Sequence, residues 1–267
     1  MQAAPATRAE FPFQFREGLL WIEVNVPQSD KPLNFLLDTG AGVSVINLTT
    51  AKRLGLNLAE RVNVRGVGSV TEGYWPQRLS AKIGEVLLPK EFLAVDLGEL
   101  SKVCECCVDG LLGVDFFQGR AVQIDFQAQK VRLVKSGAVS TNAAVLALRA
   151  SSRSLLAPVQ INNSGPQWMR LDTGCVPALQ WVAKGARAVG TKAAVSVGLT
   201  ELNIPTTPTR VQLGAETFEA VPTGLHDSEL FSGEAGLLGN GLLSEFERVT
   251  IDVKASRLVL QGRCTKS

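Results

Sequence analysis

The chain has 267 residues, of which 45% are hydrophobic and 19% are charged. This balance is typical of a folded globular protein and excludes a largely disordered chain. The formal net charge is +2 and no Lys/Arg-rich cluster stands out, so we expect neither nucleic acid nor an anionic membrane surface as a partner. No apolar stretch approaches the roughly 20 residues needed to cross a bilayer, and we therefore expect no membrane span.

The first ten residues, MQAAPATRAE, lack the charged-then-apolar layout of an export signal. An Ala/Pro-rich start of this kind often remains after such a signal has been removed, although a natural disordered tail has the same composition. On the first reading we expect a periplasmic or secreted protein.

Short apolar runs that end in Gly, Pro or Asn predict many short strands in the first half. Strands are expected at 19–26 and before Asp38, followed by a short helix over 48–56, which has a Thr start and a Gly stop. A hairpin is expected over 62–79, then two short strands within 81–97. A closing hairpin over 121–134 ends this half, and the polar segment 135–142 is the best candidate for a linker.

The second half repeats the first in order and in nearly constant spacing. Asp172-Thr173-Gly174 repeats Asp38-Thr39-Gly40, and Leu237-Leu238-Gly239 repeats Leu111-Leu112-Gly113. The closing hairpin also has a counterpart, at 249–260. Two copies of one all-β unit of about 120 residues explain this pattern and fit the usual size of a domain.

Each half resembles the aspartic protease superfamily, which includes pepsin-like and retropepsin-like enzymes, in its Asp-Thr-Gly and in the Leu-Leu-Gly that follows it. The resemblance covers about 19–260. It implies an all-β fold of two homologous six- to seven-stranded β-barrel lobes of the acid-protease type, related by a pseudo-twofold axis, with short helices. We expect the lobes at 15–138 and 145–262, each carrying one Asp-Thr-Gly.

The resemblance also implies an aspartic endopeptidase in which Asp38 and Asp172 activate one water against an extended polypeptide. Two carboxylates a few ångströms apart share one proton, so one can accept a proton from the water while the other donates to the substrate carbonyl, as is established for aspartic proteases. Thr39 and Thr173 are expected to brace the two loops, and Gly40 and Gly174 to allow the sharp turns. Because one chain supplies both aspartates, we expect a monomer, with no metal and no organic cofactor.

Two other interpretations remain open from the sequence. A single Asp-Thr-Gly is also a common turn in β-proteins, although two copies in matching contexts favour the catalytic interpretation. The same fold is also compatible with a non-catalytic protein that binds peptide or carbohydrate, or with a highly specific processing protease.

The hairpin over 62–79 lies where the superfamily carries its flap, with the tip expected near Gly66, Gly68 and Ser69. Tyr74 and Trp75 are flap aromatics by analogy, or ordinary core aromatics on a strand. A second flap around 197–200 is expected if the chain resembles a fused retropepsin dimer.

Ala41 follows the first motif as in retropepsin-like proteins, where pepsin-like enzymes have Ser or Thr. Since alanine lacks a side-chain donor, we expect the dyad anion to lose one contact and activity to peak at mildly acidic pH. Cys175, at the matching position, is expected to be a small buried side chain.

The remaining cysteines and the single histidine suggest no further chemistry. Cys104, Cys106 and Cys107 lack the spacing and the His partners of a zinc site, so a disulfide within this set and Cys264, or reduced thiols, are the alternatives. His226 lies in a polar stretch without a repeat counterpart and is expected at the surface.

Overall fold

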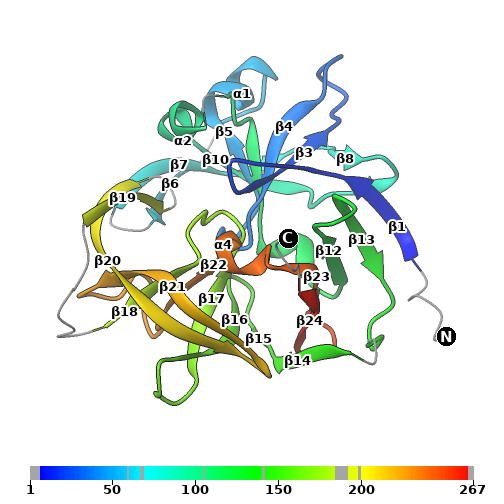
Figure 1. The fold of residues 1–267 in the computed structure, drawn as a ribbon. Coiled ribbons are helices and arrows are strands. Elements are labelled where there is room, and N and C mark those ends of the chain that lie inside the picture. The colour runs from blue at the N-terminus through cyan, green and yellow to red at the C-terminus, as the bar shows by residue number, and fades with distance from the viewer. Residues whose placement is uncertain are drawn as a thin grey trace.

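The computed structural model describes residues 7–58, 60–66, 69–104, 106–139, 142–183, 192–197 and 200–263. In these ranges the chain forms three large β-sheets, one small two-stranded sheet and four short helices. Figure 1 shows strands of the first half in blue to green above those of the second half in yellow to orange, with a third group of strands at the right. No helix within the described ranges is both long and apolar enough to cross a membrane.

The first half builds an eight-stranded sheet in the order β2-β3-β4-β11-β5-β10-β7-β6. Its strands are β2 (Gln14–Arg16), β3 (Leu19–Val24), β4 (Leu33–Leu37), β5 (Val45–Asn47), β6 (Arg61–Gly66), β7 (Ser69–Arg78), β10 (Glu91–Val95) and β11 (Gly110–Leu112). The helices of this half are α1 (Leu48–Arg53), α2 (Gly98–Val103) and α3 (Val114–Phe117), and β8 (Lys82–Ile83) pairs with β9 (Val86–Leu87). The helix expected at 48–56 is thus confirmed as α1, which Asn47 caps by accepting a hydrogen bond from the Thr49 N–H.

The second half builds another eight-stranded sheet in the order β15-β16-β17-β22-β18-β21-β20-β19. This order matches the first sheet position by position, which confirms the internal duplication. Its elements are β15 (Arg149–Ala150), β16 (Leu155–Ile161), β17 (Gln167–Asp172), β18 (Leu179–Val182), β19 (Lys192–Val197), β20 (Thr200–Leu213), β21 (Glu216–His226), β22 (Gly236–Gly239) and the helix α4 (Asn240–Leu243).

The closing hairpins of both halves leave their own sheets and join a third, six-stranded sheet in the order β1-β13-β12-β23-β24-β14. The two halves meet where β12 pairs antiparallel with β23, for example Gln123 with Thr250. The strands are β1 (Thr7–Pro12), β12 (Ala121–Asp125), β13 (Lys130–Val134), β14 (Ala143–Ala147), β23 (Phe246–Asp252) and β24 (Arg257–Arg263). The described residues of 135–142, the expected linker, lie between β13 and β14 and contain neither helix nor strand.

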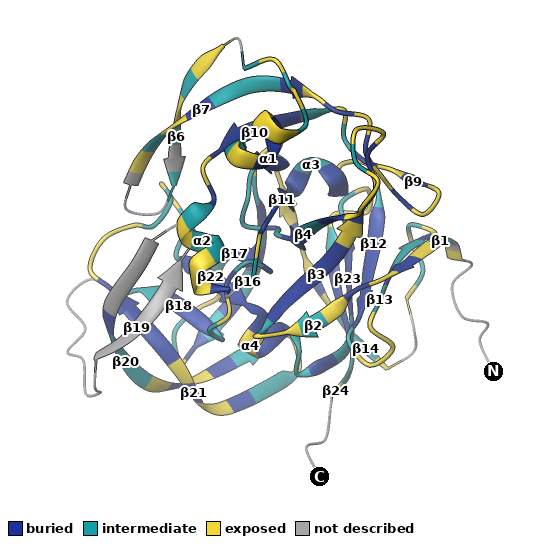
Figure 2. Ribbon diagram, turned by 90° about the horizontal axis from the view of Figure 1, so that it is seen from above, coloured by how far each residue is buried: buried dark blue, intermediate teal, exposed yellow. Residues whose placement is uncertain are grey.

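The main hydrophobic core runs through both halves and explains how the short strands are held. Most apolar residues of β3, β4, β16 and β17 are fully or almost fully buried, and Figure 2 shows β3 largely in the colour of buried residues. Each Leu-Leu-Gly runs parallel to the strand that delivers the aspartate, Leu111 beside Leu36 and Leu238 beside Leu171. The core therefore fixes the two aspartate turns at the ends of buried strands, where they face the other half.

Candidate active site

The two Asp-Thr-Gly turns are built in the same way in both halves. Asp38 follows β4 and Asp172 ends β17. In the first turn the Ala41 N–H donates to the Asp38 carbonyl at 3.3 Å, and in the second the Cys175 N–H donates to the Asp172 carbonyl at 3.1 Å. The residue after each Leu-Leu-Gly secures the turn, since the Val114 N–H donates to the Ala41 carbonyl and the Asn240 N–H to the Cys175 carbonyl.

Each glycine of the motif packs against the aspartate of the opposite half. A Cβ atom placed on Gly174 would lie 2.6 Å from Asp38 Cγ, and one placed on Gly40 would clash with the Asp172 carboxyl group. These contacts leave no room for a side chain at either position. The structure therefore brings Asp38 and Asp172 face to face across the boundary between the halves.

The two threonines interlock the turns through four buried hydrogen bonds. The Thr39 hydroxyl donates to the Leu171 carbonyl at 2.9 Å and accepts from the Thr173 N–H at 3.0 Å. The Thr173 hydroxyl donates to the Leu37 carbonyl at 2.6 Å and accepts from the Thr39 N–H at 3.0 Å. Both side chains are almost completely buried, so the bracing expected of Thr39 and Thr173 is present.

The two carboxyl groups are not equivalent. Asp38 Oδ1 accepts from the Gly40 N–H at 2.9 Å and the Ala41 N–H at 3.2 Å, whereas Asp172 Oδ1 accepts from the Gly174 N–H at 3.0 Å. Burial raises the pKa of Asp38, although the N–H groups of Gly40 and Ala41 restrain it. Burial and then the neighbouring charge of Asp38 raise the pKa of Asp172, which donates a hydrogen bond to Asp38. The two carboxyl groups can share one proton, and the second N–H donor at Asp38 favours the negative charge on Asp38.

The structure adds a contact at Ala41 that its residue type did not reveal. The side chain has no donor, as expected, but the main-chain N–H donates to the Asp38 carboxylate. Side-chain chemistry alone missed this bond because the turn itself aims the N–H at the carboxylate. Burial is the first cause that raises the pKa of both carboxyl groups.

The expected flap is the hairpin of β6 and β7, in which Gly66 pairs with Ser69. Gly68 lies outside the described residues. Tyr74 is half-buried, packs against the main core and donates from its hydroxyl to Glu72 Oε1 at 3.1 Å, which favours its reading as a core aromatic. Trp75 lines a hollow of about 800 Å³ together with Val43 and Asp115.

A second hairpin takes the matching place in the other half. β19 and β20 pair from Lys192 with Pro205 to Val197 with Thr200, at the same edge position of their sheet as β6 and β7. The residues at its tip, 198 and 199, lie outside the described residues. The structure thus contains a flap-like hairpin in each half.

The cysteines divide into one buried residue at the dyad and a separate loop. Cys175 is completely buried, as expected, and burial followed by the charges of Asp172 and Asp38 raises its pKa well above the ordinary value. Cys104, Cys106 and Cys107 are free thiols, so the alternative of a disulfide in this loop is not met in the structure. Cys264 lies outside the described residues.

The prediction that His226 lies at the surface is wrong. β21 extends as far as His226, which pairs with Val182 of β18, and the side chain is buried with Nε2 2.8 Å from Gln180 Oε1. Burial lowers the pKa of this histidine. The polar residues that suggested a loop, Asp227 and Ser228, begin only after the strand has ended.

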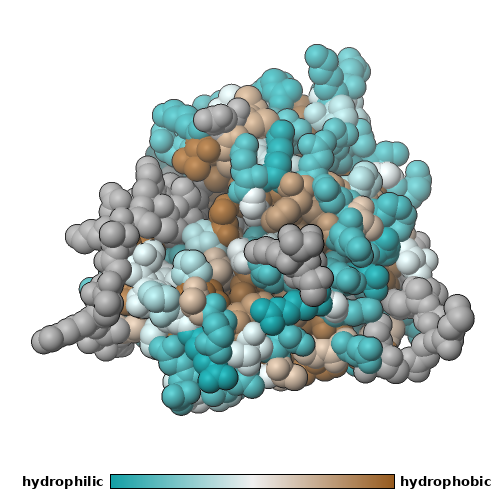
Figure 3. Space-filling model, in the orientation of Figure 1, coloured by the Kyte–Doolittle hydropathy of each residue, from teal (hydrophilic) through white to brown (hydrophobic). Residues whose placement is uncertain are grey.

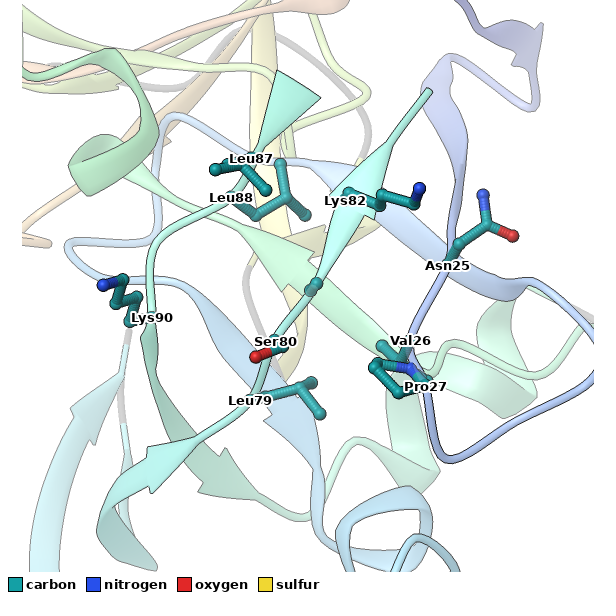
Figure 4. Close-up of a pocket in the computed structure, with 10 residues that line it drawn as sticks. Asn25, Val26, Pro27, Leu79, Ser80, Lys82, Leu87, Leu88 and Lys90 are labelled. Carbon is teal, nitrogen blue, oxygen red and sulfur yellow. The ribbon is translucent and has the colours of Figure 1, made fainter. Parts of the chain in front are cut away.

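Apolar and charged residues collect at different parts of the surface. Figure 3 shows apolar residues near the middle of one face, with hydrophilic residues above and below them. A separate hollow of about 400 Å³ lies in the first half, lined by residues that follow β3 and by the segment from Leu79 to Lys90. In Figure 4 the Leu79 side chain points toward Val26 and Pro27, while the amines of Lys82 and Lys90 point away from each other. Neither aspartate lines this hollow, so we assign it no part in the candidate site.

Two residues that the sequence interpretation passed over lie directly against the aspartate turns. Arg170, two residues before Asp172, is buried and donates to the Gly40 carbonyl at 3.1 Å. Asn240, directly after Leu-Leu-Gly, is buried and donates through Nδ2 to the carbonyls of Gly18 and Thr173, at 2.7 Å each. An arginine inside an apolar strand was the available signal, because buried arginines require partners.

Comparison with known proteins agrees with this geometry. A family model described as "Aspartyl protease" matches residues 22–116. A curated relative, the retrovirus-related Pol polyprotein from transposon 412 of Drosophila melanogaster, is 27% identical over 99 residues, which are 37% of this chain and 8% of the polyprotein. The chain therefore spans only a small part of that relative.

A likeness in structure extends over both halves. The crystal structure of the aspartic proteinase from Irpex lacteus matches with a TM-score of 0.59 and 15% sequence identity, covering 96% of this chain and 97% of that one. At this level of identity the match shows the fold, which is that of a two-lobed aspartic proteinase. The family model over the first half and the paired Asp-Thr-Gly turns agree with that fold.

Proposed function

We propose that the protein is a single-chain aspartic endopeptidase in which Asp38 and Asp172 form the catalytic dyad. The observation that carries this proposal is the close packing of each motif glycine against the aspartate of the other half. The Thr39–Thr173 interlock supports it, because four buried hydrogen bonds hold the two turns in one fixed relation.

The asymmetry of the two carboxyl groups supports a proposal for their roles. Asp38, which accepts two N–H groups, is the ionised member that takes a proton from a water held between the carboxyl groups. Asp172 carries the shared proton and donates it toward the oxygen of the scissile carbonyl. The attacking water gains negative character as the carbonyl oxygen gains a proton, so no large net charge builds up in the buried site. The two aspartates exchange roles when the amine leaves.

An extended polypeptide is the proposed substrate. The two flap-like hairpins lie at matching edges of the two sheets, so each half can offer main-chain donors and acceptors to a strand-like ligand. Because both aspartates come from one chain, the proposed active form is a monomer. We propose export to the periplasm or the cell exterior from the composition of the N-terminal residues alone.

Cleavage of a denatured peptide mixture between about pH 3 and about pH 7 tests the proposal, with and without a statine-type inhibitor. The unmodified chain should cleave with an optimum at mildly acidic pH, and the inhibitor should abolish cleavage. An optimum below about pH 3 would refute the expected balance between burial and N–H donation in the dyad.

The Asp38→Asn variant is the matched control, since asparagine keeps the shape of the side chain and removes the base. Cleavage that survives this change would refute the dyad assignment. Absence of cleavage in the unmodified chain at every pH would favour a binding protein on the same fold or a protease of narrow specificity.

A further inference from the structure

Arg170 lies at the junction of the two halves and has no counterpart in the first half. Two residues before Asp38 the chain has Leu36, a buried apolar residue beside Leu111, whereas two residues before Asp172 it has Arg170, beside Leu237. Figure 1 shows β17, which carries Arg170, beside β22. The two halves therefore share the backbone at this position but differ in chemistry, with an apolar residue in the first half and a cationic one in the second.

The guanidinium group is held in one orientation by several contacts. Its Nε and Nη2 donate to the two carboxylate oxygens of Glu234, at 2.8 and 2.6 Å. Phe231 covers its face, with Cζ 3.8 Å from the ring centroid. Both side chains of the Arg170–Glu234 ion pair are at most 9% exposed. A planar fork fixed in this way has little freedom to move.

The remaining donor, Nη1, reaches across the boundary between the halves. It donates to the Gly40 carbonyl at 3.1 Å and to the Arg153 carbonyl at 3.2 Å. Gly40 is also the residue whose N–H donates to the Asp38 carboxylate. Arg170 thus binds the carbonyl group of Gly40, and the N–H group of Gly40 binds the Asp38 carboxylate.

The second half also makes another buried hydrogen bond to the first half. Asn240 donates to Gly18 of the first half, and its counterpart after the first Leu-Leu-Gly is the apolar Val114. At both of these matched positions, the second half supplies a buried polar group and the first half an apolar one. The duplicated lobes have therefore diverged where they contact each other's turns.

We infer that Arg170 is a positioning residue for the dyad: oriented by Glu234, its guanidinium fixes the Gly40 carbonyl and so sets where Asp38 lies relative to Asp172. This inference deepens the proposed function and rests on it. The charged groups that face Arg170 are Glu234, from the segment before β22, and the two aspartates. Arg153 contributes its main-chain carbonyl.

The charge of Arg170 has an effect on the pKa of the two aspartates that a residue acting only through packing would not have. The positive charge of Arg170 acts to lower the pKa of both aspartates, against the larger effect of burial. Removal of that charge should raise the pKa of both carboxyl groups. The acidic and the basic limbs of the pH–rate profile should then move to higher pH together.

Three variants separate charge, geometry and folding. Arg170→Met/Glu234→Gln removes both members of the buried pair, so no lone charge is left to unfold the protein. Arg170→Lys keeps the charge, but its single ammonium group cannot reproduce the fork to Glu234 and the bond to Gly40. Arg149→Met is the matched control, since Arg149 stacks on Trp168 at 3.7 Å in the same half and makes no described contact with the dyad turns.

The kinetic experiment compares kcat and KM on a peptide substrate across the pH range, with active enzyme counted by titration with a tight-binding statine-type inhibitor. The double variant should lose about 10- to 100-fold in kcat with little change in KM, because a small misplacement of a reacting group has costs of this order. Both limbs of its pH profile should move to higher pH, because Arg170 is among the main influences on the pKa of both aspartates and Glu234, the other charge removed, is among those of neither. Arg170→Lys should lose kcat while its limbs stay in place, and Arg149→Met should match the unmodified chain.

A second readout does not depend on activity. Carbon-13 labelling of the aspartates allows the dyad carboxyl groups to be titrated by NMR in the unmodified chain and in the double variant, with Asp38→Asn and Asp172→Asn to assign the signals. If the unmodified chain cleaves nothing, the proposed function fails while the NMR titration still decides the role of Arg170. Coincident titration curves, or kcat and pH limbs like those of Arg149→Met, would overturn the inference and leave Arg170 a structural residue only.

Discussion

Replacing Thr39 by valine removes one hydroxyl from the interlock and keeps the shape of the side chain. The change deletes the bonds to the Leu171 carbonyl and from the Thr173 N–H, and both of these groups stay buried without their partner. Each buried polar group left unpaired costs about 1 to 3 kcal/mol, so the variant should lose about 2 to 6 kcal/mol of its free energy of unfolding. The loss falls on the contact between the halves, so kcat should fall as well.

Urea denaturation measures the free energy of unfolding. The rate of peptide cleavage, divided by the enzyme concentration from active-site titration, measures kcat. Thr39→Ser is the control, because it keeps the hydroxyl and should cost only about 1 kcal/mol for the lost methyl group. The Thr173 hydroxyl makes two other hydrogen bonds, but a shift of the turns would weaken these as well as the two bonds of Thr39. The Thr39→Val/Thr173→Val variant should therefore lose less than the sum of the single losses. If Thr39→Val were as stable and as active as Thr39→Ser, the interlock would not hold the dyad.

Two further changes should alter stability with opposite dependence on pH. Burial acts to raise the pKa of Asp252, but hydrogen bonds from Gly137, Ser136 and Ala255 and the charge of Arg257 outweigh it and lower that pKa. Asp252→Asn should therefore cost about 2 to 4 kcal/mol at neutral pH, and thermal unfolding should show the loss shrinking as the pH falls through the lowered pKa. The pKa of Asp172 is raised, so the folded chain loses stability as the pH rises and this carboxyl group ionises. Asparagine does not ionise, so the Tm of Asp172→Asn minus the Tm of the unmodified chain should increase from acidic to neutral pH. A Tm difference that does not vary with pH would contradict either prediction.

The sequence predicted the repeated parts of the molecule well, because local patterns specify them. Asp38, Asp172 and their Leu-Leu-Gly partners are short motifs at matching spacings, and the structure places them as the duplication requires. The α1 helix was readable from its start and stop residues. The bracing of the two loops by Thr39 and Thr173 was expected from the resemblance, and the structure shows the four hydrogen bonds that form it.

Other features depend on contacts between distant segments that no local pattern encodes. Arg170 meets Gly40 only because the two halves dock, and the sequence around Arg170 shows neither partner. The exchange of the closing hairpins into one shared sheet is likewise a property of the docked halves. His226 was misplaced because the turn residues that follow it concealed the end of a strand whose partner, β18, lies more than forty residues earlier in the chain.

Main-chain donors were the other source of error. The Ala41 N–H donates to Asp38 whatever the side chain is, so the residue type could not reveal this contact. For Tyr74 the sequence left two interpretations open, a flap aromatic and a core aromatic. Its aromatic ring fitted the flap analogy, yet its place in the middle of β7, opposite Arg61 and Ala94, directs it to the core.

The catalytic dyad is tested most directly by the rate of peptide cleavage by Asp38→Asn and Asp172→Asn beside the unmodified chain, all counted as folded protein and assayed at the optimum pH. The unmodified chain should cleave the peptide, a statine-type inhibitor should abolish that cleavage, and neither variant should cleave above background. Equal cleavage by all three proteins would contradict the assignment of Asp38 and Asp172 as the catalytic dyad.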